Sequence, residues 1–338
     1  MQISTNTIPV PPKDYGGTQR DIHYLTEELV RRGHEVILFA MKGSTTNATK
    51  IFEYTSNDLD QQLEFIMRHL PSDADIIHDH YGIVSKANPP IPTLRQSHSN
   101  RRLTGVQIPV YVSKTMLRKI GKNNGYYVHN GIRLSDYNFR QKKKGYLLYL
   151  GRIMQQKGVH LAIEVAKKTG KDLIIAGTLN NTSSYEQYFN AEIKPHLNQQ
   201  IRYVGPVGGR TKTNLLSSAS CVLFTSTWEE PFGLVLIEAL ACGTPVLGFK
   251  KGAVPEILKG FPQLLCNSTE EMALKVQNRS GFPSPLSCRN YVRKHFSDRI
   301  MTTNFLRLYR KIIREKAYKI LKNPIWKKRN MGVARKRR

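Results

Sequence analysis

Short apolar runs alternate with longer amphipathic segments along most of the chain. Asp21–Arg32 repeats apolar residues at helical spacing and is followed by Gly33, so it predicts a helix that ends there. Glu35–Ala40 (EVILFA) then predicts a short buried strand. Further strands are expected at 75–77, 91–94, 110–113 and 126–128. Because strands and helices alternate, the first half predicts a mostly parallel sheet covered by helices on both faces.

A polar, charged segment, Gln141–Gly145 (QKKKG), interrupts this pattern near mid-chain and predicts a linker. A second alternating series follows it. Its expected strands are 146–150, 172–177, 201–204, 221–224 and 244–249, where the series closes. Two such halves predict two Rossmann-like domains whose strands direct their carboxyl ends at a shared ligand cleft.

The chain has 338 residues, which is too long for one ordinary core and fits two domains of comparable size. We expect an N-terminal domain over 1–140 and a C-terminal domain over 141–300. Apolar residues recur at helical spacing from Phe305 to Leu321, which predicts a C-terminal helix within 301–325. Residues 326–338 form a basic tail.

Positive charge is concentrated at the C-terminal end of a chain whose net charge is +27. From Tyr309 to Arg338, thirteen Lys or Arg residues accompany one acid, Glu315. Such a tail indicates an anionic partner, which could be membrane headgroups, an acidic glycan or nucleic acid. The alternative is a solvated basic terminus without a partner.

Cysteine usage and hydropathy bear on the compartment. The four cysteines include no C-x-x-C pair, which predicts a reducing compartment without disulfides or zinc. The opening MQISTNTIPV lacks the basic and apolar regions of a signal peptide. The longest near-apolar run, 232–249, is interrupted by Glu238 and by a turn at 242–245, so it does not predict a membrane span. We therefore expect a cytoplasmic protein, peripheral on the inner face of a membrane if the tail binds one.

The segment Glu230–Glu256 (EPFGLVLIEALACGTPVLGFKKGAVPE) gives the strongest chemical signal. Glu230 and Glu238 lie about two helical turns apart, and Pro231 favours a helix start just after the first of them. Amide groups after Gly233 would be free at the positive end of the helix dipole, which suits a phosphate. Glu238 stands alone in an apolar stretch, where a carboxylate is costly unless it has a partner. The segment thus predicts a diphosphate cradle flanked by two carboxylates that bind sugar hydroxyls.

Two further motifs point to the same chemistry. In 150–158 (LGRIMQQKG), Arg152 and Lys157 follow a strand and precede a helix, where fixed cations would stabilise a departing diphosphate. In 11–18 (PPKDYGGT), Gly16 and Gly17 would let the backbone approach a ligand closely. The alternatives are two ordinary surface cations and a plain turn.

Taken together, these motifs resemble those of the retaining glycosyltransferases of family GT4, which have the GT-B fold. The resemblance consists of an E-x7-E signature at 230–238, a G-R-x4-K-G phosphate clamp at 151–158 and a glycine-rich first loop. It extends to Lys250–Glu256, which is similar to the family's G-G-x-P-E loop, with Gly252-Ala253 in place of the glycine pair. It implies an acceptor domain at 1–140, a nucleotide-sugar donor domain at 141–300 and a C-terminal helix that crosses back to the first domain.

The resemblance also implies roles for individual residues. Glu238 matches the residue that binds the donor ribose, and Glu230 matches the residue that contacts the transferred sugar. His98 is similar in placement to the family histidine near the reacting sugar, with a structural histidine as the alternative. The implied catalytic residues are His98, Glu230, Arg152 and Lys157. The implied donor-binding residues are Gly16, Gly17, Arg152, Lys157, Glu230, Phe232, Gly233, Leu234 and Glu238.

No metal or other cofactor is expected. His78 and His80 flank Asp79, but no third ligand follows at metal spacing. The D-x-D patterns at 58–60 and 73–75 do not follow apolar strands and are interpreted as loop and capping acids. The chain has no Walker loop, no G-x-S-x-G elbow and no G-x-G-x-x-G fingerprint, which disfavours an ATPase, a hydrolase of that class and a dehydrogenase.

The implied function is transfer of a hexose from a UDP- or GDP-sugar to an acceptor hydroxyl, with retention at the anomeric carbon and without a metal. Cell-envelope glycans, glycolipids and small metabolites are the acceptor classes that the family covers. Two alternatives stay open: a basic nucleic-acid-binding protein without enzyme activity, and a GT-B sugar-nucleotide epimerase. The sequence does not identify the donor base, the sugar or the acceptor.

Overall fold

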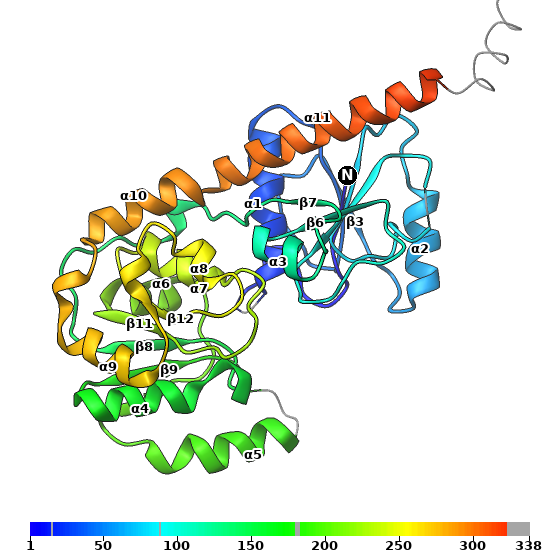
Figure 1. The fold of residues 1–338 in the computed structure, drawn as a ribbon. Helices are drawn as coiled ribbons and strands as arrows, with labels where there is room; N and C mark the ends of the chain where they lie inside the picture. The colour runs from blue at the N-terminus through cyan, green and yellow to red at the C-terminus, as the bar shows by residue number, and fades with distance from the viewer. Residues whose placement is uncertain (15, 88, 180–182, 323–338) are drawn as a thin grey trace, which may run out of the picture.

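The computed structural model describes residues 1–322 apart from 15, 88 and 180–182 (Figure 1). The chain folds into two α/β units, each built on a parallel sheet, as the sequence predicts. The basic tail expected at 326–338 lies outside the described residues.

The first unit contains a seven-stranded sheet in the order β3-β2-β1-β4-β5-β6-β7, with every neighbouring pair parallel. Its strands are β1 Gln2–Ile3, β2 Ile37–Ala40, β3 Lys50–Glu53, β4 Ile77–Asp79, β5 Thr93–Ser97, β6 Ile108–Tyr111 and β7 Tyr126–Tyr127. Its helices are α1 Gly17–Arg31, α2 Leu59–Arg68 and α3 Lys114–Lys119. Asp58 of the first D-x-D pattern caps α2 by accepting a hydrogen bond from Gln61 N.

The second unit contains a six-stranded parallel sheet in the order β10-β9-β8-β11-β12-β13. Its strands are β8 Leu147–Leu150, β9 Leu173–Ala176, β10 Ile201–Tyr203, β11 Cys221–Phe224, β12 Val246–Phe249 and β13 Leu265–Cys266. Its helices are α4 Val159–Thr169, α5 Ser183–Glu192, α6 Gly209–Ser218, α7 Leu234–Ala241, α8 Val254–Ile257, α9 Thr269–Gln277 and α10 Pro285–His295. β9, β11 and β12 are buried along their whole length, because helices cover both faces of a parallel sheet.

Several predicted element bounds were wrong. The helix expected from Asp21 begins at Gly17, because the glycine loop runs directly into it with Gly16 as N-cap. The strand expected at 75–77 is β4, which runs from Ile77 to Asp79. The second series does not close at 249, since the two-residue strand β13 pairs outside β12. The C-terminal helix begins at Asp298 rather than after 300.

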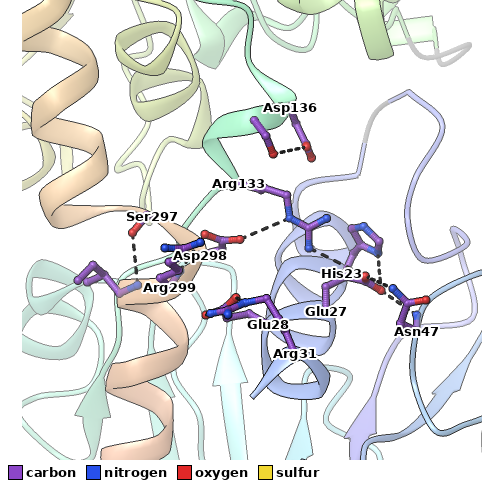
Figure 2. A network of polar contacts seen from close by, with 12 residues as sticks. His23, Glu27, Glu28, Arg31, Asn47, Arg133, Asp136, Ser297, Asp298 and Arg299 are labelled. Atoms are coloured by element: carbon purple, nitrogen blue, oxygen red, sulfur yellow. Dashed lines mark hydrogen bonds and ion pairs between the residues drawn. The ribbon is translucent and has the colours of Figure 1, made fainter. Parts of the chain in front are cut away.

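The chain crosses between the units twice, and the two crossings lie side by side. Ile132 on the outgoing segment donates its amide to Phe296 O (2.9 Å) and accepts from Asp298 N (3.0 Å) on the returning one. Figure 2 shows Arg133 between these segments and α1, with Nε 3.5 Å from Asp298 Oδ2 and NH2 4.0 Å from Glu27 Oε2. The two crossings and α1 are therefore held together by one polar network.

The last helix, α11 Asp298–Lys322, returns to the first unit and packs across α1 (Figure 1). Arg32 at the end of α1 donates to Arg299 O (2.8 Å) and Thr303 Oγ1 (2.9 Å). The largest buried apolar cluster also includes side chains from both units, for example Val112 and Leu223. This shared apolar cluster and the contact of α11 with α1 hold the two units at a fixed distance across the cleft.

Candidate active site

A cavity of about 280 Å³ lies between the two units and is lined by residues of both. All ten residues proposed from the sequence for catalysis or donor binding line this one cavity: Gly16, Gly17, His98, Arg152, Lys157, Glu230, Phe232, Gly233, Leu234 and Glu238. They come from loops and helix starts after strands, which a parallel sheet gathers at its carboxyl edge.

Helix α7 points its amino end at the cavity. Gly233 is its N-cap, with φ at 87°, a left-handed conformation that glycine adopts without strain. Leu234 and Val235, the first two residues of the helix, line the cavity. Amide groups in the first turn of a helix have no acceptor within that helix, so they can bind an anion with the helix dipole behind them.

Glu230 lies in the loop before α7, as its spacing from Pro231 predicts. Its side chain is almost fully buried, and its Oε1 accepts hydrogen bonds from Lys157 Nζ and from Ser226 Oγ (2.6 Å). Lys157 and Glu230 thus form an ion pair on the cavity wall. An ammonium group has three donors, so Lys157 keeps capacity for a phosphate oxygen beside this pair.

Arg152 lies in the loop between β8 and α4 and faces the same cavity. Its Nε is buried and has no hydrogen-bond partner among the described residues. A buried donor on a permanent cation is costly to leave unpaired, and an anionic oxygen is its best acceptor.

Glu238 lies inside α7 and is 3% exposed. It accepts hydrogen bonds from Lys212 Nζ (2.6 Å) and Tyr137 OH (2.9 Å) on its Oε1. Burial alone would raise the pKa of Glu238, but the Lys212 and Arg20 cations outweigh it and lower the pKa. Glu238 is therefore ionised at neutral pH and can accept hydrogen bonds from ligand hydroxyls.

The glycine loop of the first unit meets α7 across the cavity. A Cβ added at Gly17 would lie 3.0 Å from Leu234 Cδ1, and one at Gly16 would lie 2.6 Å from Pro12 Cβ. Gly16 therefore has no room for a side chain, whereas at Gly17 the end of the Leu234 side chain would have to shift.

His98 follows β5 and lies on the first unit's wall of the cavity, beside Asp21 of α1. Burial lowers the pKa of His98 to about 4. Burial, with the Glu238 carboxylate adding to it, raises the pKa of Asp21 well above its usual range. At neutral pH this wall is accordingly much less charged than its residue types suggest.

The loop resembling G-G-x-P-E supports Glu230 from behind. Gly252 has φ at 55°, and a Cβ there would collide with the backbone N and O of Glu230. Ala253 has φ at −84° and donates its amide to Glu230 O (2.9 Å). This explains why alanine is tolerated at the second position of the expected glycine pair but glycine is present at the first.

Three residues at the cavity were not predicted from the sequence. Lys212 and Asp21 line it, and Tyr137 hydrogen-bonds Glu238. Lys212 follows Gly208-Gly209 at the start of α6, a strand–loop–cation arrangement like that of Arg152, and this signal could have identified it. Asp21 and Tyr137 carry no comparable signal, because their relevance depends on contacts with residues far away in the sequence.

The described part of the chain offers neither a metal-ligand cluster nor a membrane-spanning helix. Within it, no group of three or more His, Cys, Asp or Glu side chains is arranged to hold a metal ion. None of its helices combines the length and apolar character needed to cross a bilayer. The four cysteines are buried and unpaired.

Known structures share this two-sheet architecture. A glycosyltransferase involved in avilamycin A biosynthesis superimposes with a TM-score of 0.77 at 23% identity, covering 92% of this chain and 97% of that one. Sucrose-phosphate synthase from Thermosynechococcus elongatus gives a TM-score of 0.75 at 17% identity, covering 93% and 98%. The fold is GT-B. The structure of Anabaena HepE in complex with UDP-glucose matches with a TM-score of 0.70 at 14% identity, covering 92% of this chain and 98% of that one.

Sequence comparisons match mainly the second unit. Residues 134–278 match the family model of glycosyl transferases group 1. An uncharacterized glycosyltransferase of Methanocaldococcus jannaschii is 31% identical over 131 residues, which are 36% of this chain and 33% of the relative. Glycogen synthase of Mycobacterium tuberculosis is 29% identical over 176 residues, 49% of this chain and 42% of the relative. The matched segments thus span less than half of these two relatives.

Proposed function

We propose that the protein is a retaining glycosyltransferase of the GT4 type that moves a hexose from a nucleotide-diphosphate sugar to an acceptor hydroxyl. The observation that carries this proposal is the convergence of two cations, a helix amino end and two buried carboxylates on one interdomain cavity. The cations and the helix end suit a diphosphate, and the carboxylates suit hydroxyl groups of ribose and sugar.

In the proposed reaction the bond between the anomeric carbon and the diphosphate oxygen breaks while the acceptor oxygen bonds to the same carbon. The acceptor attacks on the face from which the diphosphate leaves, and its proton passes to the leaving phosphate. Arg152, Lys157 and the start of α7 stabilise the charge that develops on that phosphate. Because these groups supply fixed positive charge, we propose that the reaction needs no metal, and activity unchanged by a chelator is the expected result.

The donor is proposed to be a UDP- or GDP-sugar. The complex of HepE with UDP-glucose supports this proposal, because HepE shares the two-unit architecture of this chain. Glu238 would hold the ribose hydroxyls and Glu230 the transferred hexose, with domain closure excluding water from the cleft. The acceptor class is proposed from charge alone: a hydroxyl presented at an anionic membrane surface, which the basic tail would bind on the cytoplasmic side.

The test is thermal unfolding in the presence of UDP-, GDP- and ADP-sugars, with Arg152→Ala and Glu238→Ala alongside. A ligand that binds only the folded state raises the melting temperature, by mass action. We expect a rise with one nucleotide family that both variants lose. No rise with any nucleotide sugar at millimolar concentration would count against the proposal.

Two measurements separate the alternatives. Net release of a nucleoside diphosphate in step with acceptor glycosylation identifies a transferase, because an epimerase releases none. Binding to any duplex with a steep salt dependence and no response to nucleotide sugars would instead identify a nucleic-acid-binding protein.

A further inference from the structure

Three buried histidines form a row that runs from the cavity to α11. His98 Nε2 lies 3.1 Å from His80 Nδ1, and the rings of His80 and His78 stack at 3.9 Å. His78 Nδ1 lies 2.7 Å from the hydroxyl of Tyr309 on α11. Of these three histidines, only His98 lines the cavity. His78 and His80 can therefore affect a bound ligand only indirectly, by way of His98.

The side-chain amide of Gln2 on β1 lies against one ring nitrogen of His80. Its Nε2 donates to Thr26 Oγ1 (2.8 Å), and in this orientation its Oε1 lies 3.2 Å from His80 Nε2. An amide oxygen only accepts, so His80 Nε2 must carry the hydrogen. Burial lowers the pKa of His80 well below its usual range, and a neutral imidazole has a single N–H. His80 Nδ1 is therefore an acceptor.

The tautomer of His98 follows from that of His80. Since His80 Nδ1 accepts, His98 Nε2 must donate, which leaves the lone pair on His98 Nδ1. That nitrogen faces Asp21 Oδ2 at 3.7 Å, too far for a direct hydrogen bond. Both carboxyl oxygens of Asp21 are buried without a hydrogen-bond partner among the residues described. Burial raises the pKa of Asp21 and favours its protonated form, which carries an O–H donor. A ligand hydroxyl at this edge of the cavity can therefore donate to His98 Nδ1 and accept from Asp21.

We propose that Gln2 and His80 are positioning residues that hold His98 as the neutral Nε2–H tautomer, so that His98 Nδ1 and Asp21 together receive a ligand hydroxyl. The identity of that hydroxyl, on the sugar or on the acceptor, rests on the proposed function. The tautomer itself does not, because it follows from contacts within the first unit.

The direct test is nitrogen NMR of the full chain labelled with ¹⁵N-histidine. The His98 signals are those absent from the His98→Asn variant. We expect Nε2 of His98 to carry the proton and Nδ1 to be bare at neutral pH. A protonated Nδ1 in the wild-type protein would overturn the proposal, and this result requires no variant of Gln2 to fold.

Variants of Gln2 test the cause. Gln2→Met removes the acceptor that orients His80, and we expect a protonated Nδ1 of His98 to appear. Gln2→Glu keeps an acceptor there, so the wild-type tautomer should persist. Tyr309→Phe is the matched control, because it removes a buried hydrogen bond from the same row without touching Gln2. An unchanged His98 spectrum in folded Gln2→Met, or the same change in Tyr309→Phe, contradicts the proposal.

Turnover provides the functional readout. With UDP-glucose as the probe, Gln2→Met should lower kcat roughly 3- to 10-fold, the worth of one hydrogen bond, with KM for the nucleotide sugar unchanged. An equal loss in Tyr309→Phe would mean that the row is only structural. If no nucleotide sugar turns over in the wild-type protein, the proposed function fails while the tautomer measured by NMR still stands.

Discussion

Thr115 in the first unit donates two hydrogen bonds to one carboxylate oxygen of Glu256 in the second, from its amide and from its hydroxyl, each 2.7 Å long. The other oxygen accepts from Lys114 N (2.8 Å) and His129 Nε2 (2.5 Å). Glu256 thus covers the amino end of α3 across the domain boundary. The loop Lys250–Glu256 thus has two contacts: Ala253 hydrogen-bonds the backbone of Glu230, and Glu256 hydrogen-bonds the first unit across the cleft.

This contact predicts a specific dependence of stability on pH. Burial disfavours the charged form of Glu256, but the hydrogen bonds from His129 and Thr115 outweigh it and lower the pKa to about 2. The folded-state pKa is below the unfolded value of about 4.5, so the contribution is complete above pH 4.5 and is lost as the pH falls toward 2. Glu256→Gln should lower the free energy of unfolding by about 1.5–3 kcal/mol at pH 7 and remove this part of the acid sensitivity.

Urea denaturation at pH 7 and at several values below 4.5 measures both effects. Glu64→Gln is the control, because Glu64 is exposed and pairs with Arg68 four residues away on the same helix. It should change the free energy of unfolding by less than about 0.5 kcal/mol. A difference between wild type and Glu256→Gln that does not shrink in acid would contradict the assignment.

Gly252→Ala should cost more than backbone strain alone. Its φ of 55° disfavours any other residue, and the added Cβ would meet the Glu230 backbone. Gly170→Ala is the matched control, with φ at 62° and open space around the new Cβ, and should cost about 1–2 kcal/mol. We expect Gly252→Ala to exceed that value and to lose the melting-temperature rise with nucleotide sugars. Equal costs for the two variants would show that the close approach to Glu230 has no effect.

Lys212→Met should leave the Glu238 carboxylate buried without its cation. Both side chains are largely enclosed, with 10% and 5% of their surfaces exposed. Removing one partner of such a pair costs about 3–5 kcal/mol, and adding Glu238→Gln should recover part of that loss. Equilibrium unfolding of the two single variants and the double variant gives the coupling. Additive losses would mean that the two side chains do not interact.

Removal of 327–338 (KKRNMGVARKRR) should weaken binding to vesicles that contain anionic lipid. Each basic residue near an anionic surface contributes roughly 1 kcal/mol, and salt screens the attraction. Cosedimentation with anionic and with neutral vesicles measures the effect. The truncated and full-length chains should behave alike on neutral vesicles, and equal binding to anionic ones would show that the tail has no membrane role.

Much of the fold and of the cavity lining could be read from contiguous residues. β11 matches its predicted run, and Glu230, Gly233 and Glu238 lie on one loop and helix as their spacing predicts. β13 was not foreseen, because two residues held by pairing with β12 leave no periodic signal. The strand β1 was not predicted for the same reason, since it too has only two residues. Its Gln2 nonetheless contacts His80 in the histidine row.

Two alternating α/β halves, and the loops that bear Arg152, Lys157 and Glu230, can be predicted from the sequence alone. Hydrophobic period, glycine turns and helix starts depend on residues close together in the chain, so they are visible without a structure. The partners of the buried polar and charged groups become visible only in the folded structure. Three hydrogen-bonded pairs show this: their partners are 26, 78 and 141 residues apart in the sequence for Lys212–Glu238, Gln2–His80 and Thr115–Glu256, respectively. Which buried polar groups satisfy one another depends on how the sheets and helices pack, and no local pattern encodes it.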